Sequence, residues 1–259
     1  MSVVGLNVWG VGGVYSVTQL HDIIYIISAE SSSILRFNST THQRLTDIKV
    51  KDLIIPTDIV ACQQTSHIYV CDFKCIWLMS AVDEDIKLWL PKSPSDTFKL
   101  SVTSTRLLVT SEYTHQLTQF DSDGDELSRV QLPDYIRPHH AVESPTGTFI
   151  ISQLNKQLKQ GQLIEVNTAG QELRQFSRSL GYTPHIAVDS HGNILLADND
   201  SRRILLLDNH LSLRRVIINE HQLNCKQPLC LCYMEQSGQL LVGLYGQDGQ
   251  VAVFDVHRH

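Results

Sequence analysis

The sequence predicts an all-β protein, a six-bladed β-propeller of four-stranded antiparallel blades. Short apolar runs separated by polar turns, a pattern typical of antiparallel strands, occur along the whole chain. Four prolines, Pro56, Pro138, Pro184 and Pro228, each precede such a run, and they lie 82, 46 and 44 residues apart. These separations are one double step and two single steps. A step of about 40–46 residues is the length of one four-stranded propeller blade.

The repeat can be aligned six times along the chain. First strands are expected at 12–17, 59–61, 98–102, 141–142, 186–188 and 229–232, and second strands at 24–28, 68–72, 107–111, 149–153, 194–198 and 240–244. Third strands follow at 34–37, 76–79, 117–120, 163–166, 204–207 and 251–254. Outer strands are expected at 44–50, 86–90, 127–132, 172–176 and 213–218, where polar and apolar residues alternate as in a strand with one face in solvent. The blades then divide a single domain, 1–259, at 10–50, 51–90, 91–132, 133–176, 177–218 and 219–259.

The two ends of the chain are expected to complete one blade together. The sixth copy stops after its third strand, and residues 3–9 precede the first copy without a blade of their own. Placing residues 3–9 as the outer strand of the sixth blade closes the ring and removes its open sheet edges. In the fourth blade, residues 154–161 are expected to form a long loop between second and third strands, on a rim where binding loops commonly lie.

The fifth copy, residues 182–208, resembles an NHL repeat. Pro184, Ile-Ala-Val-Asp at 186–189, Gly192-Asn193, Ala197-Asp198 and Arg203-Ile204 fall in the order and spacing of that repeat. The resemblance implies a recognition module similar to the C-terminal propeller of tripartite-motif NHL proteins, some of which bind proteins and others RNA. Similar propellers also occur in enzymes, the amidating lyase and the lactonase-like hydrolases, which use metal ligands in the channel.

Composition narrows the classes of partner and compartment. The formal net charge is −6 and no basic stripe runs along the chain, which disfavours RNA as a partner. No apolar run approaches the roughly 20 residues of a membrane-spanning helix, and the N-terminus lacks signal-peptide features. We therefore expect a cytoplasmic protein, monomeric as an isolated domain. The six cysteines lack zinc-site spacing, so we expect buried free thiols and no cofactor.

No catalytic constellation is predicted. The residues that end the second strands are expected to line the channel: Ser28, Asp72, Ser111, Gln153, Asp198 and Leu244. Only Asp72 and Asp198 are charged, and they lie three blades apart, so we expect them to bond nearby backbone rather than hold a metal or a substrate. His139 and His185 could share a metal ion, but hydrogen-bonded rim histidines are the simpler interpretation. Residues 121–126 carry the alternating carboxylates of a calcium loop, which a glycine turn explains equally well.

The function expected from these observations is recognition of a protein partner by a non-enzymatic scaffold. The candidate binding residues lie in or beside the loops between second and third strands: Phe73, Lys74, Tyr113, His115, Lys156, Lys159, Arg202, Arg203 and Tyr245. One alternative is RNA binding through the lysines and arginines of this rim. The other is a metal-dependent hydrolase or lyase with its site in the channel.

Overall fold

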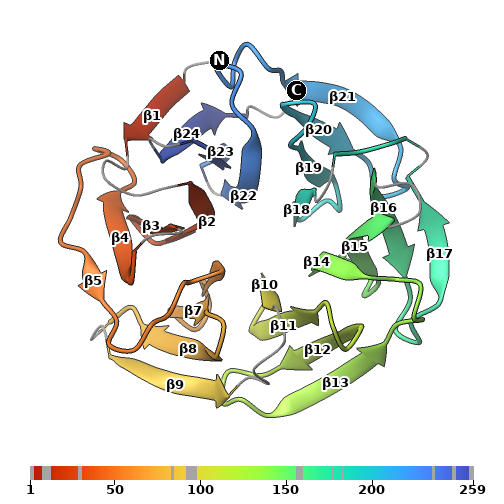
Figure 1. Ribbon diagram of the computed structural model, residues 1–259, viewed down its shortest axis with the longest axis horizontal. Coiled ribbons are helices and arrows are strands. Elements are labelled where there is room, and N and C mark those ends of the chain that lie inside the picture. Colours follow the sequence, from red (N-terminus) through yellow and green to blue (C-terminus); the bar gives the residue numbers. More distant parts are fainter. Residues whose placement is uncertain are drawn as a thin grey trace.

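The protein is a six-bladed β-propeller, as the sequence predicts. The computed structural model describes residues 3–7, 13–28, 31–82, 85–91, 98–155, 160–176, 178–181, 184–234, 237–246 and 249–256. The structure contains six four-stranded sheets. These sheets are arranged in a ring about a common axis (Figure 1). Neighbouring strands within each sheet are antiparallel.

Each of the first three blades is a meander of consecutive strands. The first blade contains β2 (Val14–Leu20), β3 (Ile23–Ser28), β4 (Ser33–Asn38) and β5 (Ile48–Lys49). The second contains β6 (Asp58–Cys62), β7 (His67–Cys71), β8 (Cys75–Ser80) and β9 (Ile86–Pro91). The third contains β10 (Phe98–Thr103), β11 (Arg106–Ser111), β12 (Gln116–Phe120) and β13 (Glu126–Gln131).

The other blades follow the same order, with the N-terminal strand added to the last. The fourth blade contains β14 (Pro138–Glu143), β15 (Phe149–Asn155), β16 (Gln160–Val166) and β17 (Glu172–Gln175). The fifth contains β18 (His185–Val188), β19 (Ile194–Asp198), β20 (Arg203–Leu207) and β21 (Leu213–Ile218). The sixth contains β22 (Pro228–Met234), β23 (Gln239–Leu244), β24 (Gln250–Asp255) and β1 (Val3–Asn7).

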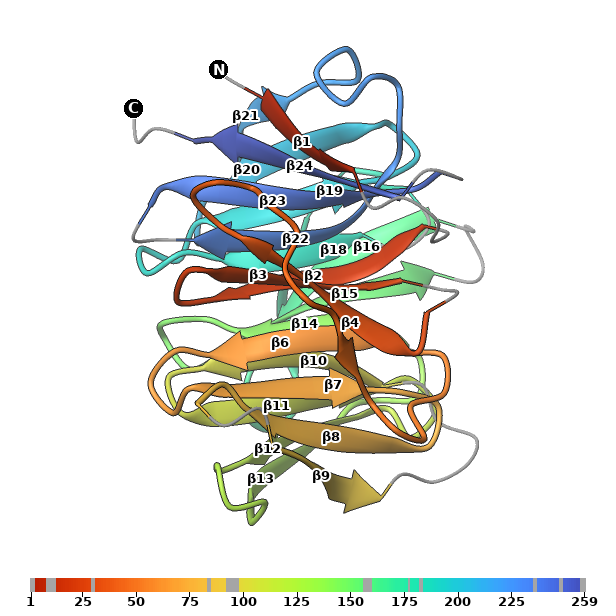
Figure 2. The same cartoon turned by 90° about the vertical axis from the view of Figure 1, so that its left-hand side faces the viewer.

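Closure of the ring by the N-terminal segment is confirmed. Strand β1 pairs antiparallel with β24 in a register that runs from Val3 opposite Phe254 to Asn7 opposite Gln250. The two strands lie side by side in both views of the ring (Figures 1 and 2). Residues 8 and 9 of the predicted closing segment lie outside the described part of the chain. The pairing gives the sixth blade its outer strand.

Two elements differ from their predicted extents. Regular pairing in the first outer strand is limited to Ile48–Lys49 and a bridge from Phe37 to Arg44. Between these points, the side chain of Arg36 donates a hydrogen bond to the carbonyl oxygen of Thr46. In the fourth blade, part of the expected loop continues the antiparallel pairing of the second and third strands, since residues 154–155 pair with residues 160–161. Residues 156–159 between them lie outside the described part of the chain.

Polar turns between third and outer strands are held by one side chain each. The side-chain oxygens of Asn38, Asp121, Asn167 and Asp208 accept hydrogen bonds from backbone N–H groups two to four residues further on. In the turn that begins at Asp121, Gly124 adopts a φ of 97°, which favours glycine. The turn therefore uses one of the alternating carboxylates of residues 121–126, that of Asp121, as a backbone acceptor.

The core consists of six apolar clusters, each between two adjacent blades. The cluster between the sixth and first blades contains Leu6 of β1, Val251 and Val253 of β24, and Val14 and Val17 of β2. Leu6 is only 2% exposed. The closing strand therefore contributes to packing as well as to the hydrogen-bonded ladder.

The residues that the structure describes include no helix that could span a membrane.

Truncating Leu6 should destabilise the whole ring. Leu6→Ala removes a buried side chain from the closing cluster, and such a change costs about 2–5 kcal/mol. Gly5→Ala on the same strand is the matched control, because Gly5 is exposed and an added Cβ would meet nothing within 4 Å. Urea unfolding measures both free energies. Equal stability of the two variants would show that the closing strand does not hold the ring together.

Candidate binding site at the channel mouth

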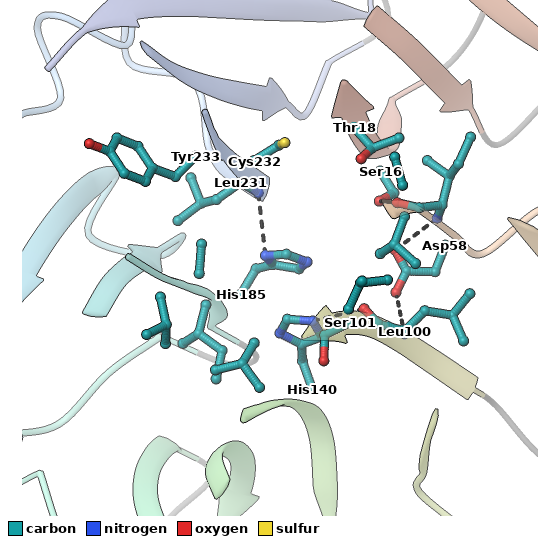
Figure 3. Close-up of a pocket in the computed structure, with 18 of the residues that line it drawn as sticks. Ser16, Thr18, Asp58, Leu100, Ser101, His140, His185, Leu231, Cys232 and Tyr233 are labelled. Atoms are coloured by element: carbon teal, nitrogen blue, oxygen red, sulfur yellow. Dashed lines mark hydrogen bonds between the residues drawn. The ribbon is translucent and has the colours of Figure 1, made fainter. Parts of the chain in front are cut away.

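The central channel is lined by the innermost strands of the blades. A cavity of about 180 Å³ lies between β2, β6, β10, β14, β18 and β22. Its wall combines apolar side chains with Ser16, Asp58, Ser101, His140 and His185, as Figure 3 shows. The polar side chains of this wall are the ones that can hydrogen-bond to a ligand.

Six equivalent positions, one on each innermost strand, form a layer that holds side chains of five kinds. Four of these side chains line the cavity, Lys99 lines the pocket at its mouth, and Cys230 is buried in the core cluster between the sixth and first blades. Each belongs to an innermost strand and pairs with the equivalent residue of the second strand: Ser16, Asp58, Lys99, His140, His185 and Cys230 lie opposite Ile27, Cys71, Thr110, Ser152, Ala197 and Gly243. The sixfold repeat of the backbone therefore carries an asymmetric set of groups. An asymmetric set is what recognition of a single ligand requires.

Hydrogen bonds from this layer join neighbouring blades. Ser16 Oγ donates to the Ile59 carbonyl at 3.3 Å, and the backbone N–H of Leu100 donates to Asp58 Oδ2 at 2.8 Å. His185 Nδ1 accepts from the backbone N–H of Leu231 at 3.3 Å (Figure 3). These bonds satisfy much of the polar layer within the protein and fix the spacing of the first strands.

The imidazoles of His140 and His185 stack, with ring centroids 4.1 Å apart and an angle of 18° between the planes. Burial lowers the pKa of His140 to about 4, against a weaker opposing effect of Asp58. Burial, reinforced by the charges of His140 and Lys99, lowers the pKa of His185 well below its ordinary value. Both rings are therefore neutral at pH 7. His140 Nε2 contacts the Leu100 carbonyl at 3.3 Å, so it carries the proton and Nδ1 bears a lone pair.

At the mouth of the channel, a pocket of about 280 Å³ is lined by Tyr15, Ile55, Thr57, Phe73, Lys99, His139, Asn199 and Leu229. Lys99 is half-buried there, and its Nζ donates to the Thr57 carbonyl at 2.7 Å. Burial, together with the charge of Lys99, lowers the pKa of His139 to about 3. Lys99 is therefore the charged group of this pocket.

The six residues predicted to line the channel lie elsewhere. They lie at or near the C-terminal ends of the second strands, and none of them lines the central cavity, whose wall comes from the first strands, one step further in. The physical reason is the propeller geometry, in which the first strand of each blade shields the second from the axis. All six are buried: Ser28, Asp72, Ser111, Gln153, Asp198 and Leu244.

Three of these buried side chains clamp the segments that connect successive blades. Asp72 accepts a hydrogen bond from the backbone N–H of Ile54, Gln153 from that of Arg137, and Asp198 from that of Gly181. Asp72 also accepts from the backbone N–H groups of Lys74 and Cys75 and from Trp77 Nε1. The expectation that the two aspartates bond nearby backbone is therefore confirmed.

Of the remaining three residues, Ser111 and Leu244 have local structural roles, and the structure does not explain the burial of Ser28. Ser111 Oγ accepts from the Thr114 backbone N–H and contacts the Thr114 hydroxyl. Leu244 packs in the cluster between the fifth and sixth blades. The hydroxyl of Ser28 is buried and has no hydrogen-bond partner among the residues that the structure describes.

The predicted rim residues lie on the face that carries the channel mouth. Phe73, Tyr113 and Tyr245 are 43%, 67% and 61% exposed. Lys74 and Arg202 are exposed, whereas His115 and Arg203 are half-buried, and the Arg203 guanidinium pairs with Asp198 at 2.8 Å. Lys156 and Lys159 lie outside the described part of the chain.

Sequence reasoning missed other apolar residues on the same face. Tyr15, Ile54, Ile55 and Tyr135 are exposed and lie at the start of a first strand or in the connection that leads to one. In an antiparallel meander, these connections and the loops between second and third strands emerge at the same face. In the sequence, the signal that could have identified Tyr135 is a tyrosine in the connection shortly before a predicted first strand.

The described residues form neither a metal site nor a reactive thiol within the core. Within the described ranges, no group of three or more His, Cys, Asp or Glu residues could hold a metal ion. All six cysteines are free; Cys62, Cys71, Cys75 and Cys230 are buried as expected, but Cys225 is exposed and Cys232 partly so. Burial raises the pKa of the Cys230 thiol to about 12, so it is not a nucleophile at neutral pH.

Comparison with known proteins shows the fold. No family model and no curated protein sequence matches the chain. Among solved structures, a streptogramin B lyase is 10% identical over 98% of this chain and 97% of its own, with a TM-score of 0.67. A virginiamycin B lyase from Staphylococcus aureus is 12% identical over 98% and 99%, with a TM-score of 0.64. A protein of unknown function from Bacteroides caccae is 16% identical over 84% and 81%, with a TM-score of 0.67.

Acidification should destabilise the protein through the stacked histidines. The unfolded chain binds protons at these residues near pH 6.5, whereas the folded protein binds one at His140 only near pH 4, and the pKa of His185 is also well below its ordinary value. Stability therefore rises with pH through this window. At pH 5 the neutral His140 should cost on the order of 2 kcal/mol, and His185 adds a loss of the same sign. Urea unfolding at pH 7 and pH 5 should show the loss, and His185→Gln should flatten it; an unchanged pH profile in that variant would contradict the assignment.

Removing the Asp72 carboxylate should loosen the connection into the second blade. Burial alone would raise the pKa of Asp72, but hydrogen bonds from Trp77 and three backbone N–H groups lower it overall. Asp72→Ala leaves these donors without an acceptor and should cost about 2–3 kcal/mol at pH 7. Because the folded pKa is lowered, the difference from the unchanged protein should shrink as the pH falls through it. Asp123→Ala, at an exposed turn position, is the control and should be neutral in urea unfolding.

Proposed function

We propose that this propeller is a recognition module that binds a protein partner on the face around the channel mouth. The observation that carries the proposal is the gathering of exposed aromatic rings on that face. In the described part of the chain, all exposed aromatic side chains are there: Tyr15, Phe73, Tyr113, Tyr135 and Tyr245. Aromatic residues are enriched at interfaces because they bury a large area at a small cost in side-chain entropy.

The remaining surface offers a useful contrast. The exposed large hydrophobic residues elsewhere are aliphatic, and they lie on or beside outer strands or at the opposite face: Leu45, Val82, Leu88, Leu127, Leu173 and Val216. Singly scattered aliphatic residues are normal on a protein surface. The aromatic face is different in composition and surrounds a pocket, so it is the better candidate for a partner.

Charge on this face supports a protein rather than RNA. The exposed cations Lys51, Lys74 and Arg202 alternate with exposed acids, among them Asp52, Asp134 and Asp200. An RNA-binding surface needs a continuous cationic stripe to displace counterions from phosphates. Similarity of the fifth copy to NHL repeats, a family composed mostly of recognition modules, also supports the proposal. The free cysteines are typical of a reducing compartment, and we extend the proposal to a cytoplasmic protein of this family.

Removing two rim rings should release the partner. In capture experiments from cell extract, proteins retained by the unchanged propeller should be lost by a Tyr113→Ala/Tyr245→Ala variant, because central aromatic residues carry much of the energy of an interface. With the purified partner, the dissociation constant should rise at least tenfold, equivalent to about 1.4 kcal/mol.

The matched control is Leu88→Ala/Leu127→Ala, which truncates two exposed residues of outer strands. This control should retain the same proteins as the unchanged propeller. If both double variants retain them equally, the aromatic face is not the binding surface. RNA binding at low ionic strength that weakens steeply with salt would instead favour the RNA alternative.

A further inference from the structure

Lys99 places a cation at the channel mouth without an acidic counter-ion. No ion pair within the described residues includes Lys99, and the described lining of the mouth pocket contains no aspartate or glutamate. The nearby carboxylate of Asp58 accepts from the backbone N–H groups of Ile59 and Leu100 instead. Of the three N–H donors of the ammonium group, one is used by the Thr57 carbonyl. A half-buried ammonium in such a place favours an anion.

The rest of the pocket is apolar or neutral. Tyr15, Ile55, Phe73 and Leu229 supply apolar walls, and His139 is neutral at pH 7 because its pKa is lowered to about 3. With a volume of about 280 Å³, the pocket is smaller than the roughly 300–1,000 Å³ of sites that enclose a drug-sized ligand. The pocket therefore fits a single apolar group next to one negative charge.

We infer that the mouth pocket binds the C-terminal residue of a peptide chain, with its α-carboxylate on Lys99 and an apolar side chain against Phe73 and Leu229. A chain end supplies both groups from one residue. An internal acidic residue supplies only the carboxylate, since its neighbours in an extended chain point to the opposite side. An internal segment would also have to leave the pocket again, whereas a chain end can enter along the axis.

The identity of the molecule that supplies the chain end, a protein partner, rests on the proposed function. The pocket itself can be tested without that partner. The probes are N-acetyl-leucine, its amide, and the α-amide of N-acetyl-aspartate, each titrated calorimetrically into the full chain at low ionic strength. The free acid of N-acetyl-leucine should bind at least tenfold more tightly than either amide. Equal binding of the leucine acid and amide, tighter binding of the aspartate derivative, or no binding at millimolar concentration would overturn the inference.

Lys99→Met should abolish the preference for the free acid. Lys226→Met is the matched control, because Lys226 is also half-buried and donates to a neutral acceptor, Gln250 Oε1 at 2.8 Å, but does not line the pocket. A loss of preference in both variants would overturn the inference. If Lys99→Met fails to fold, Phe73→Ala serves in its place, since it removes an exposed wall and should weaken acid and amide alike.

The two proposals can fail separately. A partner that is lost by the rim variants but binds Lys99→Met as tightly as the unchanged protein would overturn the C-terminal anchor and leave the proposed function intact. Carboxylate-selective probe binding, in a protein whose rim variants still retain every captured protein, would overturn the protein-binding face and leave the pocket.

Discussion

Burial of both faces of every blade is the constraint on which this structure depends. A four-stranded blade has two largely apolar faces, and its six core clusters form only between neighbouring blades. A ring that stayed open would therefore leave two such faces in water. The pairing of β1 with β24, and the position of Leu6 between the sixth and first blades, close the last of these interfaces. Strands β1 and β24 thus stabilise each other.

Closure of the ring also determines the arrangement of the connections that surround the channel mouth. Each first strand is reached through a connection from the preceding blade, and three of these connections are held by Asp72, Gln153 and Asp198 through backbone N–H groups. Buried acceptors of this kind are costly to leave unpaired, so they keep the connections in place. The exposed rings of the rim lie on or beside the same connections and loops. A rigid support beneath adaptable surface side chains is a suitable arrangement for recognition.

The channel layer shows how a symmetric fold supports an asymmetric site. Hydrogen-bonded ladders and apolar clusters constrain the repeated backbone, but the innermost position of each blade is free to vary. In this chain the six positions hold a serine, an aspartate, a lysine, two histidines and a cysteine. The Asp58 carboxylate accepts a backbone hydrogen bond and both imidazoles are neutral at pH 7. Lys99 is therefore the member of this layer whose charge can attract an anionic ligand.

The sequence by itself determined the blade number, the order of strands and the joint between the two chain ends, because strand periodicity and repeat length are local properties that survive in one chain. It also identified Asp72 and Asp198 as structural and Phe73, Tyr113 and Tyr245 as surface residues. Only the tertiary structure decided which strand faces the axis: the alignment placed the second-strand ends there, whereas the lining comes from the first strands. The stacking of His140 on His185 and the position of Lys99 in the wall of the mouth pocket were likewise decided by the ring, since these residues meet their neighbours only when separate blades are packed around one axis.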